Sequence, residues 1–329
     1  MSMRTLFLKA DEPGVRRGAE VIRAGGLVAF PTETVYGLGA DALSAPAVAR
    51  IFEAKERPQG NPLIVHLGDA AALESVAARV PPRARDAAAR FWPGPLTLVL
   101  PRAGAVPLIT TGGLETVAAR VPSHPVALAL IEASGRPIAA PSANRSGRPS
   151  PTRAEHVWED LDGRIELILD GGPTPVGIES TVLDMTTEPP MLLRPGGVTL
   201  EQLRDCLGEV AVLKDDDLEA AGRSPGLRYR HYAPRAQVII VERGAGEVAV
   251  APWLEAGRPV ALMAQRRVSL DGPGFRVRTM PGDLEAYARD LFAVLRELDS
   301  TGVEGIFVEA VPPEGLGLTI MDRLRRAAS

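Results

Sequence analysis

The chain has 329 residues, of which 45% are hydrophobic and 24% are charged. This length is typical of two domains, and the composition supplies apolar cores and excludes wholesale disorder. The formal net charge of -4 at pH 7 argues against a protein that coats nucleic acid through bulk positive charge. A local basic pocket for phosphates remains compatible with it.

Cys206 is the single cysteine, so an internal disulfide and a cysteine-based zinc cluster are both excluded. It lies in an amphipathic helical pattern, which favours a buried structural thiol over a nucleophile. The N-terminus lacks the long apolar core of a signal peptide, and no apolar run approaches the ~18 residues of a transmembrane helix. We therefore expect a cytoplasmic protein.

Helical and strand patterns alternate through the first two hundred residues. The expected helices are 15–24, 46–56, 70–78, 83–91, 126–133 and 200–207. The expected strands are 27–30, 63–67, 96–100, 117–121, 137–140, 165–169 and 181–185. A glycine-rich turn is expected through Gly37 and Gly39. Because some connections are too short for a helical crossover, we predict an α/β domain with a mixed sheet.

The remainder of the chain divides into a linker and a second α/β unit. The segment 209–235 reads as a linker, because an acidic run is followed by a proline-bracketed stretch with two Arg, two Tyr and one His. In the second unit, strands are expected at 237–241, 259–263 and 305–308, and helices at 284–298 and 318–327. The predicted domains are therefore 1–208 and 236–329, joined by 209–235.

A nucleotide site of the common types is absent from the sequence. The three lysines, Lys9, Lys55 and Lys214, do not follow the glycine pattern of a Walker A motif, and there is no G-x-G-x-x-G fingerprint. Any nucleotide must therefore be bound in another way.

Polar residues instead gather in loops at predicted strand ends, where α/β proteins place their sites. The loop 31–39 combines hydroxyls with glycines; by itself it reads as an ordinary turn. Lys55 and Arg57 leave a helix end with only Glu56 beside them, so an anion such as a triphosphate would stabilise them. The alternative is a solvated helix C-terminus, and in either case we expect both to contribute little to the core.

Two further polar residues lie within apolar strands. A single strand histidine such as His66 is more often a satisfied structural residue than a ligand. Arg120 alternates with apolar residues and is expected to be partly buried, where a guanidinium needs a fixed carboxylate or a ligand. An internal salt bridge and a bound ligand are equally compatible with this pattern.

The loop 140–152 carries small hydroxyl and amide side chains that leave backbone N–H groups accessible to phosphate oxygens. Arg145 and Arg148 would add positive charge. The alternative is a flexible linker, but so long a connection between a strand and a helix rarely lacks a role. Two more strand ends, in 177–184 and 193–196, each bear a hydroxyl or a base.

In order and spacing, these motifs resemble the YrdC family. The motifs that carry the resemblance are Thr34-Val35-Tyr36-Gly37-Leu38, Lys55-x-Arg57-Pro58-x-x-Asn61-Pro62-Leu63, Ser142-Ala143-Asn144-x-Ser146-Gly147 and Glu179-Ser180-Thr181-Val182. The linker and the C-terminal run from Gly315 through Asp322-Arg323-Leu324 resemble the long, two-domain form. The resemblance covers nearly the whole chain. It implies a YrdC-like twisted mixed sheet with a deep cavity, and a smaller Rossmann-like C-terminal domain.

The resemblance also implies an activity. The family joins L-threonine, bicarbonate and ATP into threonylcarbamoyl-AMP and releases pyrophosphate. A downstream tRNA threonylcarbamoyl-transferase complex then uses the product, and tRNA itself would be bound at most weakly. No covalent enzyme intermediate is needed, so catalysis would depend on positioning and charge neutralisation. Mg²⁺ would be carried with ATP, since no carboxylate cluster offers a dedicated metal site.

The same resemblance implies roles for individual residues. Lys55 and Arg57 would be the catalytic cations. The residues expected to bind threonine are Thr34, His66, Arg120, Ala140 and Ser180. The residues expected to bind ATP are Arg57, Asn61, Thr116, Ser142, Asn144, Ser150, Arg194, His231 and Tyr232. The last two lie in the linker, which would close over the cavity as a lid and exclude water; alternatively, its rings attach the linker to a domain surface.

Two other functions are alternatives to this synthesis. An RNA-binding module of the same fold is disfavoured by the low net charge and the few aromatic residues. Carbamoyl transfer of the HypF type would come with acylphosphatase and zinc-finger segments, and a single cysteine excludes the latter.

Overall fold

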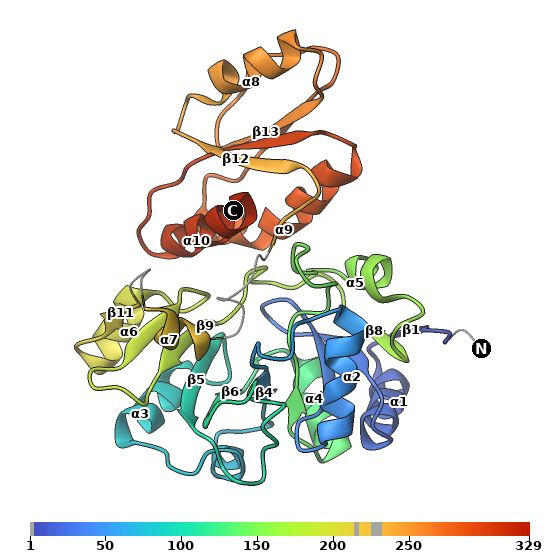
Figure 1. The fold of residues 1–329 in the computed structure, drawn as a ribbon, viewed down its shortest axis with the longest axis vertical. Coiled ribbons are helices and arrows are strands. Elements are labelled where there is room, and N and C mark those ends of the chain that lie inside the picture. The colour runs from blue at the N-terminus through green and yellow to red at the C-terminus, as the bar shows by residue number, and fades with distance from the viewer. Residues whose placement is uncertain (1–2, 214–216, 225–231) are drawn as a thin grey trace. The chain divides into compact units, whose positions relative to one another are not determined.

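The computed structural model describes residues 3–213, 217–224 and 232–329 (Figure 1). They form two compact units. The first comprises Met1–Ser146, Pro151–Pro175 and Glu179–Tyr229, and the second comprises Gly147–Ser150, Val176–Ile178 and Arg230–Ser329. Two short segments from the first two hundred residues therefore belong to the second unit.

The first unit is built on a mixed sheet, which has eleven strands in the described residues, in the order β1-β8-β2-β3-β7-β4-β6-β5-β9-β10-β11. Its strands are β1 (Leu6–Lys9), β2 (Val28–Pro31), β3 (Tyr36–Asp41), β4 (Ile64–His66), β5 (Leu96–Pro101), β6 (Thr116–Arg120), β7 (Ile138–Ala139), β8 (Leu167–Asp170), β9 (Thr181–Asp184), β10 (Met191–Arg194) and β11 (Ala211–Val212). Because β4–β6 and β5–β9 are parallel pairs while β5–β6 and β2–β3 are antiparallel, the prediction of a mixed sheet is confirmed.

The first unit also contains helices. They are α1 (Glu12–Arg23), α2 (Ala45–Lys55), α3 (Pro82–Phe91), α4 (Pro125–Ser134), α5 (Ala154–Leu161), α6 (Leu200–Leu207) and α7 (Leu218–Gly222), with the 3₁₀ helix η1 (Ala71–Ser75). Asp11 and Ser44 cap α1 and α2 by accepting from backbone N–H groups, and Thr199 forms a capping box with Gln202 at α6. These caps explain why sequence patterns located the three helices.

Two expectations for the first unit are wrong. The glycine-rich turn expected through Gly37 and Gly39 is part of the strand β3, which pairs with β2 along its first four residues and with β7 along its last two. A Cβ atom at Gly39 would lie 2.7 Å from Phe30 and Ile138, so this glycine serves close packing of the sheet rather than a turn. The helix expected at 70–78 is only the short η1, and α7 lies within the segment interpreted as a linker.

The second unit has a parallel four-stranded sheet in the order β12-β15-β13-β14, as expected of a Rossmann-like domain. Its strands are β12 (Gln237–Val241), β13 (Val260–Ala264), β14 (Phe275–Thr279) and β15 (Gly305–Glu309), and its helices are α8 (Gly246–Glu255), α9 (Leu284–Ser300) and α10 (Leu316–Ala328). None of the helices in the described part of the chain combines the length and apolar character needed to span a bilayer.

Candidate functional site

Four neighbouring strands bring predicted site residues to one edge of the first unit's sheet. His66 ends β4 and pairs in register with Arg120, which ends the parallel strand β6. On the other side of β6, the antiparallel strand β5 begins at Leu96, opposite Thr181 of β9, and Ser180 directly precedes β9. The carboxyl ends of β4 and β6 therefore lie beside the amino ends of β5 and β9.

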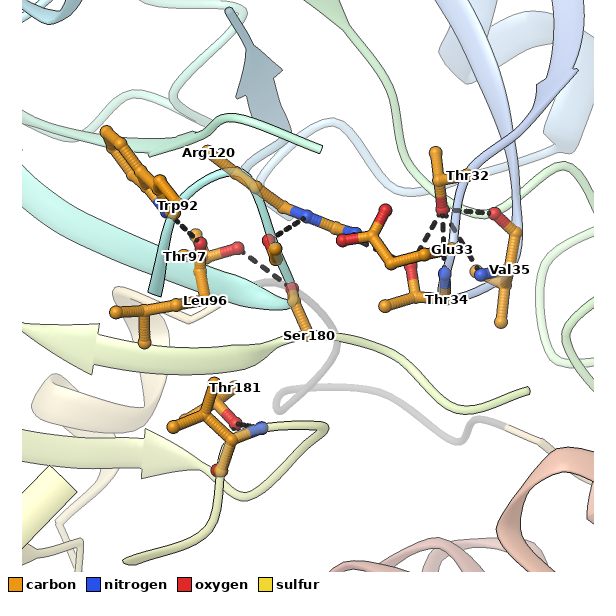
Figure 2. Close-up of polar contacts among 12 residues, drawn as sticks. Thr32, Glu33, Thr34, Val35, Trp92, Leu96, Thr97, Arg120, Ser180 and Thr181 are labelled. Carbon is orange, nitrogen blue, oxygen red and sulfur yellow. Dashed lines mark hydrogen bonds and ion pairs between the residues drawn. The ribbon is translucent and has the colours of Figure 1, made fainter. Parts of the chain in front are cut away.

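Arg120 is held in the interior by the loop between β2 and β3 (Figure 2). Its Nη2 lies 2.6 Å from Oε1 of Glu33, and the two side chains are 3% and 6% exposed. Nη1 donates to Oγ1 of Thr34 at 3.0 Å, and Nε donates to the carbonyl of Gly94 at 3.2 Å. Although it is close to Glu33, the buried Nη2 has no acceptor aligned for a hydrogen bond among the described residues. The internal salt bridge that the sequence allowed is present, and Nη2 still has capacity for a ligand oxygen.

The loop that supplies these partners is stabilised by Thr32. Its hydroxyl donates to the carbonyl of Val35 at 2.7 Å and lies 2.8 Å from the hydroxyl of Thr34. Glu33 and Thr32 were not predicted as site residues. A signal for Glu33 existed, because a buried Arg120 calls for a carboxylate and Glu33 lies in the neighbouring polar loop.

The electrostatics of this cluster favour an ionised pair beside a neutral imidazole. Burial, the largest single cause, raises the pKa of the Glu33 carboxyl, but the positive charge of Arg120 and the polar groups around the carboxylate together outweigh it and hold that pKa below its ordinary value. Burial, with Arg120 as the second cause, lowers the pKa of His66 to about 3. The Nδ1 atom of His66 lies 3.2 Å from the carbonyl oxygen of Ile64, and its ring packs edge-on against Phe30. His66 is therefore neutral near pH 7.

Ser180 is fixed from two sides. Its hydroxyl lies 2.8 Å from the hydroxyl of Thr97 in β5. Thr97 is a third residue that was not predicted, because it lies in an apolar strand. Arg194 at the end of β10 donates through Nη2 to the Ser180 carbonyl at 2.8 Å and to its hydroxyl at 3.3 Å. Arg194, expected to bind ATP, thus contacts a residue expected to bind threonine.

Lys55 and Arg57 are buried, which contradicts the expectation that they contribute little to the core. They are 1% and 9% exposed. The Nζ atom of Lys55 donates to the carbonyl of Ser142 at 2.5 Å and to that of Asn144. Arg57 donates through Nη2 to the carbonyl of Pro62 at 3.1 Å. The interpretation as a solvated helix end is therefore wrong: loops distant in sequence fold over the end of α2.

The loop after β7 is ordered by its own side chains. The hydroxyl of Ser142 donates to Oδ1 of Asn144 at 2.5 Å, and Asn144 donates to the carbonyl of Arg145 at 2.8 Å. Arg145 itself pairs with Glu56 at 2.6 Å, and the same carboxylate also pairs with Arg164 at 2.8 Å. Ser150 is fully buried, in the segment that belongs to the second unit.

The structure places two other predicted residues, Thr116 and Asn61, at the far end of the β4–β6 pair from Arg120. Thr116 begins β6 while Arg120 ends it, so Thr116 shares the opposite end of the β4–β6 pair with Asn61, which precedes β4. Ala140 is buried, and its N–H donates to the carbonyl of Ile64 at 2.9 Å.

The two linker residues differ in what the structure describes. His231 lies outside the described residues. Tyr232, in the second unit, is 4% exposed and stacks on Phe292 at 5.2 Å between ring centroids. The Arg323 guanidinium lies 5.3 Å from the centre of the Tyr232 ring. The lid therefore stays a prediction.

Comparisons with known proteins relate both units to one group of enzymes. Residues 20–196 match the family model Sua5_yciO_yrdC, described as telomere recombination, and residues 198–329 match the threonylcarbamoyl-AMP synthase C-terminal domain. A threonylcarbamoyl-AMP synthase of Pyrococcus abyssi is 50% identical over 329 residues, covering 97% of this chain and 95% of that protein. A protein of the same name from Bacillus subtilis is 46% identical, covering 98% and 94%. The crystal structure of Pyrococcus abyssi Sua5 complexed with L-threonine has a TM-score of 0.91 at 49% identity, covering 100% of this chain and 98% of that one.

Proposed function

The chain belongs to the Sua5_yciO_yrdC family and carries the C-terminal domain of threonylcarbamoyl-AMP synthases, and from this premise we propose how its residues serve that synthesis. The enzyme joins L-threonine, bicarbonate and ATP into threonylcarbamoyl-AMP and releases pyrophosphate. The product supplies the threonylcarbamoyl modification of tRNA.

The observation that carries the assignment of the threonine site is the buried guanidinium of Arg120. Its Nη2 has no aligned acceptor among the described residues, although Glu33 neutralises its charge. A ligand carboxylate can accept from such a guanidinium in a fixed, planar geometry. We assign the threonine carboxylate to Arg120, with the hydroxyls of Thr34 and Ser180 and the backbone at Ala140 as further contacts.

The same geometry limits what His66 can do. Its pKa of about 3 means that the ring carries a single N–H proton and no charge near neutral pH. We assign it a positioning role, in which the neutral ring packs beside the threonine site. The amine of threonine attacks the carbon of carbon dioxide and loses a proton to solvent. If bicarbonate is attacked instead, its hydroxyl group leaves and takes up that proton as water. The resulting N-carboxylate oxygen then attacks the α-phosphorus of ATP, and pyrophosphate leaves.

We assign Lys55 and Arg57 as the cations that neutralise charge on the triphosphate. Both are buried, and a charge acts more strongly where water is excluded. Lys55 also joins α2 to the loop that carries Ser142 and Asn144. The remaining ATP contacts are assigned to Asn61, Thr116, Ser142, Asn144, Ser150 and Arg194.

Mg²⁺ fits this arrangement as an ion carried by ATP. Among the described residues, no group of three or more His, Cys, Asp and Glu side chains is placed to hold a metal. Mg²⁺ prefers oxygen ligands and often keeps substrate phosphates among them. The triphosphate oxygens would therefore be its main ligands, and the ion would neutralise charge during transfer to the α-phosphorus. We further propose that a tRNA threonylcarbamoyl-transferase complex consumes the adenylate.

The decisive test is pyrophosphate release from ATP by the purified chain. Release is expected only when threonine and bicarbonate are both present, together with a product of the mass of threonylcarbamoyl-AMP. Equal release when either is omitted would show an ATP hydrolase rather than this synthase.

A further inference from the structure

One face of α9 contacts both of the short segments that leave the first unit. The segments Gly147–Ser150 and Val176–Ile178 belong to the second unit together with α9. Their contacts are made at Arg289 and Arg296. These two positions are seven residues apart in one helix and so lie on the same face.

The first contact requires a glycine. Gly177 has φ +76°, and a Cβ atom there would lie 2.3 Å from both the Cα and the carbonyl oxygen of Arg289. The obstacle is helix backbone, which cannot rotate away as a side chain can. The absence of a side chain at residue 177 is therefore what allows Val176–Ile178 to lie against α9.

The second contact is a pair of hydrogen bonds from one guanidinium to one carbonyl oxygen. Arg296 is 7% exposed and donates to the carbonyl of Pro149 through Nη2 at 2.6 Å and through Nε at 3.1 Å. The N–H of Ala233 also donates to the carbonyl of Gly147 at 2.8 Å. The turn 147–150 is thus held at two of its four residues by Arg296 and Ala233.

The two anchored segments lead directly into residues assigned to substrates. Gly177 precedes Ser180 by three residues, and Pro149 is adjacent to Ser150. The flanks of the 147–150 turn are tied within the first unit, since Ser146 N–H donates to the carbonyl of Lys55 and Tyr36 N–H donates to that of Pro151. If Gly177 or Pro149 moved relative to α9, only a few bonds of backbone would separate that movement from Ser180 or Ser150.

We propose that α9 is a positioning element for catalysis. It fixes the position of the loop that carries Ser180 through its contact with Gly177, and the position of the loop that carries Ser150 through Arg296. This inference rests on the proposed substrate assignments. It gives the C-terminal domain a role in the synthesis without placing any of its side chains on the reacting atoms. Gly177 and Arg296 are positioning residues in this scheme.

The first test compares two glycines of the same backbone conformation. Gly177→Ala is expected to raise the KM for threonine by about tenfold or more, with a smaller change in kcat, because misplacing a binding group by a fraction of an ångström weakens binding steeply. Gly172 has φ +81° and open space around it, so Gly172→Ala carries the same conformational strain without the collision. The control is expected to keep the KM for threonine within about twofold.

The second test compares two arginines on the same face of α9. Arg296→Gln is expected to raise the KM for ATP by about tenfold. Arg289 contacts Gly177 through its backbone, and its side chain is 49% exposed, so Arg289→Gln is expected to leave both KM values unchanged. Equal effects of the two substitutions would overturn the role of Arg296.

Amide hydrogen exchange without substrates supplies a readout independent of activity. Faster exchange within 176–184 in Gly177→Ala and within 142–152 in Arg296→Gln, with slow exchange kept in β5 and β6, supports positioning. Wild-type exchange and wild-type KM values in both variants would overturn it. If the wild-type chain shows no threonine-dependent pyrophosphate release, the proposed function fails, while the exchange data still decide whether α9 holds the loops. If Gly177→Ala does not fold, Arg296→Gln alone decides.

Discussion

Oε1 of Glu33 lies 2.6 Å from Nη2 of Arg120, and this ion pair is almost fully excluded from water. Each charge lowers the free-energy cost of burying the other in the interior. The pair ties the loop between β2 and β3 to the end of β6, so the guanidinium is already oriented before a ligand arrives. This preorganisation supports its assignment to the threonine carboxylate.

Glu33→Gln is expected to destabilise the protein by roughly 3–5 kcal/mol, because it leaves the Arg120 charge buried without a counter-charge. Threonine should restore part of the loss, since its carboxylate would replace the missing charge. Urea unfolding with and without threonine measures both effects. The control is Glu115→Gln, which breaks the ion pair between Glu115 and Arg102. The Glu115 side chain is 79% exposed, so this substitution should lower the free energy of unfolding by less than about 1 kcal/mol. A larger threonine effect in wild type than in Glu33→Gln would contradict the assignment.

Arg120→Lys is expected to fail to support threonine binding, with the KM for threonine raised at least about tenfold, because lysine keeps the charge and loses the planar fork. Initial rates of pyrophosphate release over a threonine series measure this. Arg136→Lys serves as the matched control, since Arg136 is 52% exposed and lies 3.7 Å from its partner Asp41. Normal threonine saturation in Arg120→Lys would mean that Arg120 serves only the internal salt bridge.

Lys55→Met is expected to lower both stability and turnover. Methionine keeps the apolar stem but leaves the buried carbonyls of Ser142 and Asn144 without this donor, at a cost of about 1–3 kcal/mol for an unsatisfied group. Unfolding midpoints and pyrophosphate release are measured together, with the exposed Lys9→Met as the control. Unchanged stability of Lys55→Met would show that the buried ammonium is not part of the structural core.

Stability is expected to fall in acid because of His66. Its pKa is about 3 in the folded chain and 6.5 ordinarily, so between these values the unfolded chain binds a proton that the folded chain does not. The free energy of unfolding therefore rises with pH across this window, by up to about 1.4 kcal/mol per pH unit, and levels off above it. Burial also lowers the pKa of His124, which acts in the same direction. Urea midpoints from pH 4.5 to pH 7.5 should show a shallower slope in His66→Gln than in wild type; parallel slopes would refute the prediction.

Local signals were enough to predict many elements from the sequence. The bounds of α6 and β12 were predicted as observed, because a capping box marks the first and a compact apolar run marks the second. By contrast, α8 has weak amphipathicity and contains Pro252, so it lacks the helical periodicity that identifies an element. The strand β14 was not predicted, although apolar and charged residues alternate along Phe275–Thr279. The fold class was also accessible, because the order of several loop motifs indicates the family.

The sequence by itself determined the alternation of elements, the two-domain plan and the candidate polar loops. Tertiary structure decided which of those polar groups are buried and with what partner. It paired Glu33 with Arg120, buried Lys55 under carbonyls almost ninety residues away, and assigned Gly147–Ser150 and Val176–Ile178 to the second unit. The physical reason is that periodicity and capping depend on neighbours along the chain. Burial and ion pairing depend on groups that only folding brings together.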